Sequence, residues 1–103
     1  MHTSTDSPNN VSRIIEEHLS VFDLFTHAYL FGSSLNPKTI CNDIDLLVIY
    51  SKYSEEISSA LKTISAKLER AIGLPVHLTA LSEEEEQDTG FLARIKPNYM
   101  TLK

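Results

Sequence analysis

Apolar residues recur at helical spacing in two stretches of the chain. The first stretch predicts a helix over about residues 8–22, which Ser7 can cap and in which Pro8 suits the first position. Its apolar stripe consists of Val11, Ile14, Ile15, Leu19 and Phe22. The second predicts a helix over about residues 55–72, capped by Ser54 and ended by Gly73. Its stripe consists of Ile57, Leu61, Ile64, Leu68 and Ile72.

Three other runs are short and apolar, which is typical of buried strands. They are HAYLFG, ending at Gly32, DIDLLVIY at residues 43–50, and PVHLTAL at residues 75–81. The tail of the second run is apolar at consecutive positions, which indicates that both sheet faces are covered there. Residues 33–42 between the first two runs are rich in Ser, Asn and Pro and predict a loop.

A signal for the start of a helix follows the third apolar run. Ser82 and Glu85 have the spacing of a capping box, so we expect a last helix over about residues 83–95. Residues 98–103 fit either a short edge strand or a tail, and the pattern leaves both open.

The order helix, strand, strand, helix, strand, helix predicts an α/β (α+β) fold with a small mixed β-sheet and packed helices. With 103 residues, the chain has room for one modest core. We expect a polar N-terminal tail over residues 1–7 and a single domain over residues 8–103.

Charge and composition narrow the functional classes. The net charge is −5, from 14 acidic and 9 basic residues, and no basic cluster suggests binding to nucleic acid. Cys41 is the one cysteine, and no Cys/His spacing suggests zinc. No apolar run is long enough to cross a membrane and no signal peptide precedes the first helix, so we expect a cytoplasmic protein.

Two carboxylates stand at the start of the most apolar strand. Asp43 and Asp45 point to the same strand face, about 7 Å apart along it, while Ile44 and Leu46 point to the other. Two ionised carboxylates so close together repel each other and call for a positive charge between them. Magnesium prefers such oxygen ligands and bridges them to substrate phosphates, so a two-metal site for phosphoryl or nucleotidyl transfer is one interpretation. A strand-start cap is the alternative for Asp43.

A glycine–serine turn precedes the aspartates. Gly32 lets the backbone approach a phosphate closely, because it has no Cβ. The amides and hydroxyls of Ser33 and Ser34 can then donate to phosphate oxygens.

The stretch FGSSLNPKTICNDIDLLV resembles the signature of the DNA polymerase β-like nucleotidyltransferase superfamily, most closely its minimal nucleotidyltransferase branch. Phe31, Gly32 and Ser33 match its first part, and Asp43-Ile44-Asp45-Leu46 match its second after a nine-residue gap. The resemblance covers about residues 27–82. It implies Mg²⁺ on Asp43 and Asp45, and a nucleoside triphosphate held by Gly32, Ser33 and Ser34.

The resemblance also implies a reaction and a partner. A nucleophile on the acceptor attacks the α-phosphate and releases pyrophosphate. Members of the minimal branch often stand beside a HEPN-domain helical protein in toxin–antitoxin pairs, and some add AMP to a tyrosine of that partner. Because 103 residues leave no room for an acceptor-binding domain, we expect a homo- or hetero-oligomer.

The sequence departs from the family pattern in two places. The superfamily usually supplies a third carboxylate from a later strand, and here His77 stands at that position. His77 fits a general base, or a relic of lost activity, while Glu83 or Glu84 could supply the acid if the chain bends back. The loop after the Gly-Ser pair lacks the arginine of many members and leaves Lys38 as the nearest cation.

Two functions therefore remain open. The first is a magnesium-dependent minimal nucleotidyltransferase in which Asp43, Asp45 and His77 are the catalytic residues. The second is a non-catalytic, antitoxin-like or regulatory subunit on the same fold, which masks a partner. The intact DID motif favours the first function, and the missing third acid favours the second.

Overall fold

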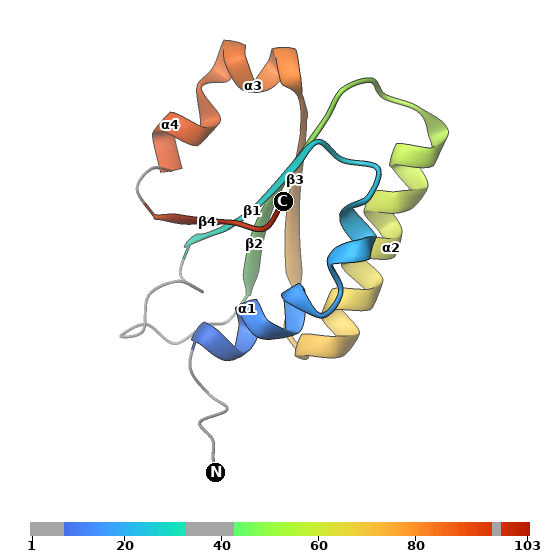
Figure 1. Cartoon of the computed structure of the whole chain (residues 1–103), viewed down its shortest axis with the longest axis vertical. Coiled ribbons are helices and arrows are strands. Elements are labelled where there is room, and N and C mark those ends of the chain that lie inside the picture. Colours follow the sequence, from blue (N-terminus) through green and yellow to red (C-terminus); the bar gives the residue numbers. More distant parts are fainter. Residues whose placement is uncertain (1–7, 33–42, 96–97) are drawn as a thin grey trace.

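The computed structural model describes residues 8–32, 43–95 and 98–103, so the predicted tail at 1–7 and the loop at 33–42 lie outside the described residues. Figure 1 shows the elements in their order along the chain. They are α1 (Pro8–Glu16), the 3-10 helix η1 (Leu19–Phe22), β1 (His27–Phe31), β2 (Ile44–Tyr50), α2 (Glu55–Ile72), β3 (Val76–Ser82), α3 (Glu83–Thr89), α4 (Phe91–Ile95) and β4 (Tyr99–Thr101).

The strands form one four-stranded sheet in the order β3-β2-β1-β4. β1 runs antiparallel to β2 and β4, whereas β2 and β3 are parallel and are joined through α2. The predicted mixed sheet with packed helices is thus confirmed. Residues 99–101 form the edge strand β4, which decides the question that the sequence left open at the C-terminal end.

Helices cover one face of the sheet. α1, η1 and α2 pack on it and enclose the main core (Figure 1). The most deeply buried members of this core are Ile15, Phe22, Leu30, Ile44, Leu46, Val48, Ile64 and Leu68. The opposite face carries a smaller cluster around Tyr29, Leu47 and Ile49, against which Phe91 and Leu92 of α4 pack.

α2 forms as its sequence predicts. The Ser54 hydroxyl accepts a hydrogen bond from the Ile57 amide at 3.3 Å, and Gly73 ends the helix with φ +85°. Ile57 is buried with Ile64 and Leu68, while Leu61 and Ile72 of the same stripe are only half-buried. The helix therefore connects the parallel strands β2 and β3 as a standard crossover.

The N-terminal helix is shorter than predicted. α1 ends at Glu16, and the His18 amide turns back to the Ile15 carbonyl at 2.9 Å while its ring Nδ1 donates to the Ile14 carbonyl at 2.8 Å. The chain then continues as the 3-10 helix η1, whose different helical geometry turns the last residues of the apolar stripe to another direction. As a result Phe22 is fully buried, whereas Leu19, a member of the same predicted stripe, is 38% exposed.

The last predicted helix is two helices. Gly90 adopts φ +63° and separates α3 from α4, and its amide donates to the Glu86 carbonyl at 2.8 Å. The Glu86 carboxylate accepts from the Leu92 amide at 3.2 Å across the break. The predicted capping box between Ser82 and Glu85 is confirmed. The bend at Gly90 lets Phe91 and Leu92 reach the second face of the sheet.

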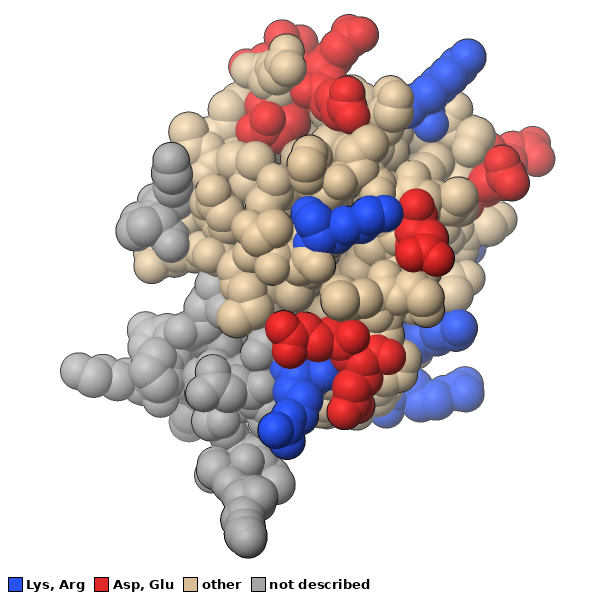
Figure 2. Space-filling view, in the orientation of Figure 1, with Lys and Arg blue, Asp and Glu red and all other residues tan. Residues whose placement is uncertain are grey.

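On the face seen in Figure 2, the described residues form a mostly neutral surface with scattered charges. In Figure 2 acidic side chains gather over α3, whose first turn consists of Glu83, Glu84, Glu85 and Glu86. In the part of the chain that the structure describes, no helix is both long and apolar enough to cross a membrane.

Candidate functional site

Three neighbouring strands bring the candidate residues to one end of the sheet. Asp45 of β2 lies in register between Phe31 at the end of β1 and His77 near the start of β3. Asp43 stands directly before β2, and Gly32 directly follows β1. Asp45 shares its strand face with Leu47, which is the face that the helices leave partly open. Ser33 and Ser34 lie outside the described residues.

Gly32 and Asp45 are in direct contact. Gly32 has φ +85°, and a Cβ built on it would collide with Oδ2 of Asp45 and lie 3.2 Å from its Cγ. Glycine is therefore required at this position for two reasons, its backbone conformation and the absence of a side chain. The turn that precedes the loop is thus packed against the carboxylate of β2.

The side chains of Asp43 and His77 are in contact at the surface. Nε2 of His77 lies 3.2 Å from Oδ2 of Asp43, and the two side chains are 63% and 40% exposed. Because water screens both groups, we expect this contact to orient the ring more than to stabilise the fold. The contact brings the imidazole of His77, which belongs to the neighbouring strand β3, next to the two aspartates.

The pKa of Asp45 is raised above its ordinary value. Burial of the carboxyl is the main cause, the negative charge of Asp43 adds to it, and His77 acts in the opposite direction. The two aspartates therefore repel each other as their spacing predicts, and a cation between them would relieve this cost.

Aromatic side chains flank the carboxylates on the same face. The Phe31 and Phe91 rings meet edge to face with centroids 5.6 Å apart, and the Arg94 guanidinium lies 5.8 Å from the Phe91 centroid. Tyr29 and Tyr99 form a second edge-to-face pair at 5.2 Å. Burial, followed by the nearby Tyr99 and Glu86, raises the pKa of Tyr29. The site is thus polar at Asp45 and apolar beside it.

The carboxylates fit magnesium by their chemistry. Mg²⁺ in proteins is usually bound by one or two carboxylates, by several waters and by substrate phosphates. Two neighbouring aspartates can therefore be the only protein side chains that bind it. Among the described residues, no group of three or more His, Cys, Asp or Glu side chains is arranged to hold a metal ion. A metal at this site would therefore depend on Asp43, Asp45 and the substrate together.

The structure excludes two sequence alternatives and adds one residue. Glu83 and Glu84 begin α3 after Ser82, which pairs with Tyr50, roughly 20 Å along the strands from the aspartates, so they cannot supply the third acid. Glu69 of α2 was not singled out by the sequence, yet its Oε2 accepts from the Val76 amide at 2.9 Å, one residue before His77. An exposed glutamate within a helix gives no sequence signal of such a role.

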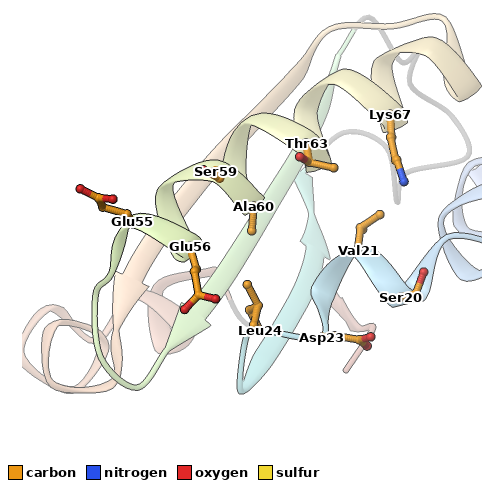
Figure 3. A pocket seen from close by; sticks show the side chains of 10 residues that line it. All are labelled: Ser20, Val21, Asp23, Leu24, Glu55, Glu56, Ser59, Ala60, Thr63 and Lys67. Atoms are coloured by element: carbon orange, nitrogen blue, oxygen red, sulfur yellow. The ribbon is translucent and has the colours of Figure 1, made fainter.

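A separate groove lies on the helical side of the sheet, between η1 and α2 (Figure 3). It has a volume of about 580 Å³, and Val21, Leu24 and Ala60 are among its apolar lining residues. None of the described candidate residues at the aspartate site lines this groove.

Comparison with known proteins identifies the family. The model of the nucleotidyltransferase domain matches residues 10–98. The chain belongs to the nucleotidyltransferase domain family. The match confirms the resemblance seen in the Gly-Ser turn and the DID motif, and Gly32, Asp43, Asp45 and His77 all lie within the matched range.

One solved structure shares the fold of this chain, and a second is less similar. One is a chain of the tri-AMPylated Shewanella oneidensis HEPN toxin in complex with MNT antitoxin, with TM-score 0.59, 20% identity, and coverage of 93% of this chain and 71% of that one. Another, with TM-score 0.48 and 24% identity, is a Sulfolobus solfataricus protein provisionally named a nucleotidyltransferase, covered over 92% of this chain and 78% of that one. No curated protein sequence matches the chain significantly.

Proposed function

We propose that this nucleotidyltransferase domain transfers a nucleoside monophosphate from a nucleoside triphosphate to an acceptor hydroxyl on a partner protein, with Mg²⁺ as cofactor. One observation carries the proposal: the Gly32 turn packs directly on Asp45, beside Asp43, in a chain of this family. A phosphate-binding turn and a metal-binding carboxylate must adjoin in this way, because the metal and the turn hold the same triphosphate.

The residues have distinct roles in this proposal. Asp43 and Asp45 hold Mg²⁺, which neutralises charge on the phosphates when it is bound. The backbone amide of Gly32, with Ser33 and Ser34, donates to the β- and γ-phosphate oxygens. The acceptor oxygen forms a bond to the α-phosphorus, and the bond from that phosphorus to the β-phosphate oxygen breaks, so pyrophosphate leaves.

His77 takes the place of the third acid. Its Nε2 faces Asp43, and its ring is 63% exposed and open to an incoming acceptor. In the neutral form the free nitrogen accepts the proton of the acceptor hydroxyl as the new bond forms, and Asp43 stabilises the resulting imidazolium. An imidazole can thus act as general base without adding a third negative charge.

We propose that the acceptor comes from another molecule. The described residues form a single sheet with its covering helices, and the face around Asp45 is only partly covered by α3 and α4. A HEPN-type helical protein is the partner that the likeness to the Shewanella oneidensis complex suggests. We therefore propose an antitoxin-like role in which modification of the partner silences it.

A transfer assay tests the proposal. The chain is incubated with Mg²⁺, each of the four common nucleoside triphosphates and a co-purified helical partner, and the partner's mass is measured. The natural chain should add a nucleoside monophosphate, the Asp43→Asn/Asp45→Asn variant should add none, and His77→Ala should bind nucleotide without transfer. Transfer by His77→Ala at the natural rate would exclude the base role.

A non-catalytic masking subunit is the second candidate. The observation that favours it is the contact of His77 with Asp43, because a protonated imidazole there would partly neutralise the carboxylate pair and weaken the demand for a metal. Under this alternative the aspartate variant would still bind and inhibit the partner as well as the natural chain does.

A further inference from the structure

β3 forms one edge of the sheet, and its outer side is open. The strand is seven residues long and is hydrogen-bonded to β2 alone. Its sequence, VHLTALS, contains no Lys, Arg, Asp, Glu or Pro, which are the residues with which natural edge strands usually prevent pairing. The opposite edge strand, β4, has only three residues. β3 is therefore the edge at which another strand can add.

The two ends of this edge are already capped by side chains. The outward amide of Val76 donates to Glu69 Oε2 at 2.9 Å, and that of Ser82 donates to Glu85 Oε1 at 2.9 Å. Since backbone groups alternate in direction along a strand, Leu78 and Ala80 point the same way as Val76 and Ser82. No described residue hydrogen-bonds to the outward amides of Leu78 and Ala80.

A groove between α2 and this edge has matched charges at its two ends. Its volume is about 480 Å³, and Leu78 lines it together with exposed Lys62 and exposed Glu69. These two residues are seven positions apart on α2, which is about 10 Å along the helix. Leu78 packs on the main core and lines this groove together with both charged side chains.

We propose that the β3 edge binds the β3 edge of a second copy of this chain, antiparallel, with the two-fold axis at Leu78. The two Leu78 residues exchange their amide–carbonyl hydrogen bonds, and each Ala80 amide donates to the Val76 carbonyl of the other copy. The same rotation places Lys62 of each copy opposite Glu69 of the other. The edge is thus complementary to itself in both hydrogen bonds and charge, as an isologous interface requires.

The pairing joins the two candidate sites on one surface. His77 and Thr79 lie on the Asp45 face, and an axis at Leu78 sets His77 of one copy directly opposite Thr79 of the other. The eight strands then form one continuous sheet with both aspartate pairs on the same side. The interface does not depend on nucleotidyl transfer. An experiment can therefore contradict the proposed dimer without contradicting the proposed function, and the reverse.

A matched pair of charge reversals tests the interface. The molecular mass in solution is measured over a range of concentrations for the natural chain, Lys62→Glu and Lys67→Glu. Lys67 lies on the same helix but points into the groove between η1 and α2 (Figure 3). The natural chain and Lys67→Glu should dimerise equally, and Lys62→Glu should raise the dimer dissociation constant about tenfold, since it replaces two attractions by two repulsions.

Disulfide trapping tests the register. In a Cys41→Ser background, Leu78→Cys should cross-link two copies under mild oxidation, because the two Cα atoms of a hydrogen-bonded pair are about 5.5 Å apart. Ala80→Cys should not, because the two Ala80 positions are four residues out of register. A monomeric natural chain, or a dimer that neither Lys62→Glu weakens nor Leu78→Cys traps, would overturn the proposal.

Discussion

At the scale of single residues, the site depends on how Gly32 meets Asp45. The positive φ of Gly32 turns the chain out of β1, and its missing side chain leaves room for the carboxylate. Asp45 in turn carries a raised pKa, because it is partly buried and lies near Asp43. Both features are costs to the fold, and such costs are typical of functional positions.

Gly32→Ala should destabilise the protein more than Gly73→Ala. Both glycines have φ +85°, so both variants incur the penalty of a left-handed alanine, about 1–2 kcal/mol. Only at Gly32 does the added Cβ strike Asp45, whereas nothing lies within 4 Å at Gly73. Urea denaturation should give Gly32→Ala an additional loss of about 1–2 kcal/mol. Equal losses would show that the close packing of Gly32 on Asp45 is absent.

Asp45→Asn should stabilise the metal-free protein near neutral pH. The raised pKa means that the folded state disfavours the ionised carboxylate, so the natural chain gains stability as the pH falls through the folded pKa toward the ordinary value. The advantage of the amide variant should therefore be present above the folded pKa and shrink on acidification. Unfolding midpoints of both proteins from about pH 8 to about pH 3 measure this difference. An advantage that grows on acidification would contradict the assigned direction.

At the scale of elements, local signals predicted most of the fold. The cap at Ser54 and the stop at Gly73 bound α2, and the apolar run DIDLLVIY predicted β2 to within one residue. α1 and the last helix were predicted too long, because the breaks after Glu16 and at Gly90 serve contacts with the sheet. An apolar stripe alone does not reveal such tertiary contacts.

The residues of the candidate site could likewise be predicted only where a local sequence signal marks them. Gly32, Asp43 and Asp45 could be predicted as candidates together because one short motif contains them, and His77 because it occupies the third-acid position within a later strand. The contacts of Phe91 with Phe31 and of Glu69 with Val76 could not, since both depend on how separate elements pack.

Glu69→Ala should loosen the start of β3. The change removes the acceptor of the Val76 amide, and an unpaired, partly buried amide costs about 1–2 kcal/mol. Glu69→Gln keeps an acceptor oxygen and should retain most of the stability. Urea denaturation, with hydrogen exchange at the Val76 amide, distinguishes the two variants. A loss for Glu69→Gln as large as that for Glu69→Ala would show that the hydrogen bond does not hold the strand.

At the scale of the whole molecule, one sheet face carries the main core and the other carries the candidate site. α1, η1 and α2 enclose the main core on the first face (Figure 1). The second face carries Asp45 and the smaller cluster, against which Phe91 and Leu92 of α4 pack. Such a division suits a nucleotidyltransferase domain whose acceptor arrives from outside. It also makes nucleotide binding separable from folding, because the aspartates lie outside the main core.

A thermal unfolding titration tests the central claim most directly. The natural chain and the Asp43→Asn/Asp45→Asn variant are heated with ATP, CTP, GTP or UTP, with and without Mg²⁺. A nucleotide at 100 times its dissociation constant stabilises by about 2.7 kcal/mol, which raises the midpoint of so small a domain by about 10–20 °C. The account predicts such a rise for at least one nucleotide, dependent on Mg²⁺ and lost in the variant. No rise with any nucleotide, in a folded sample, would contradict it.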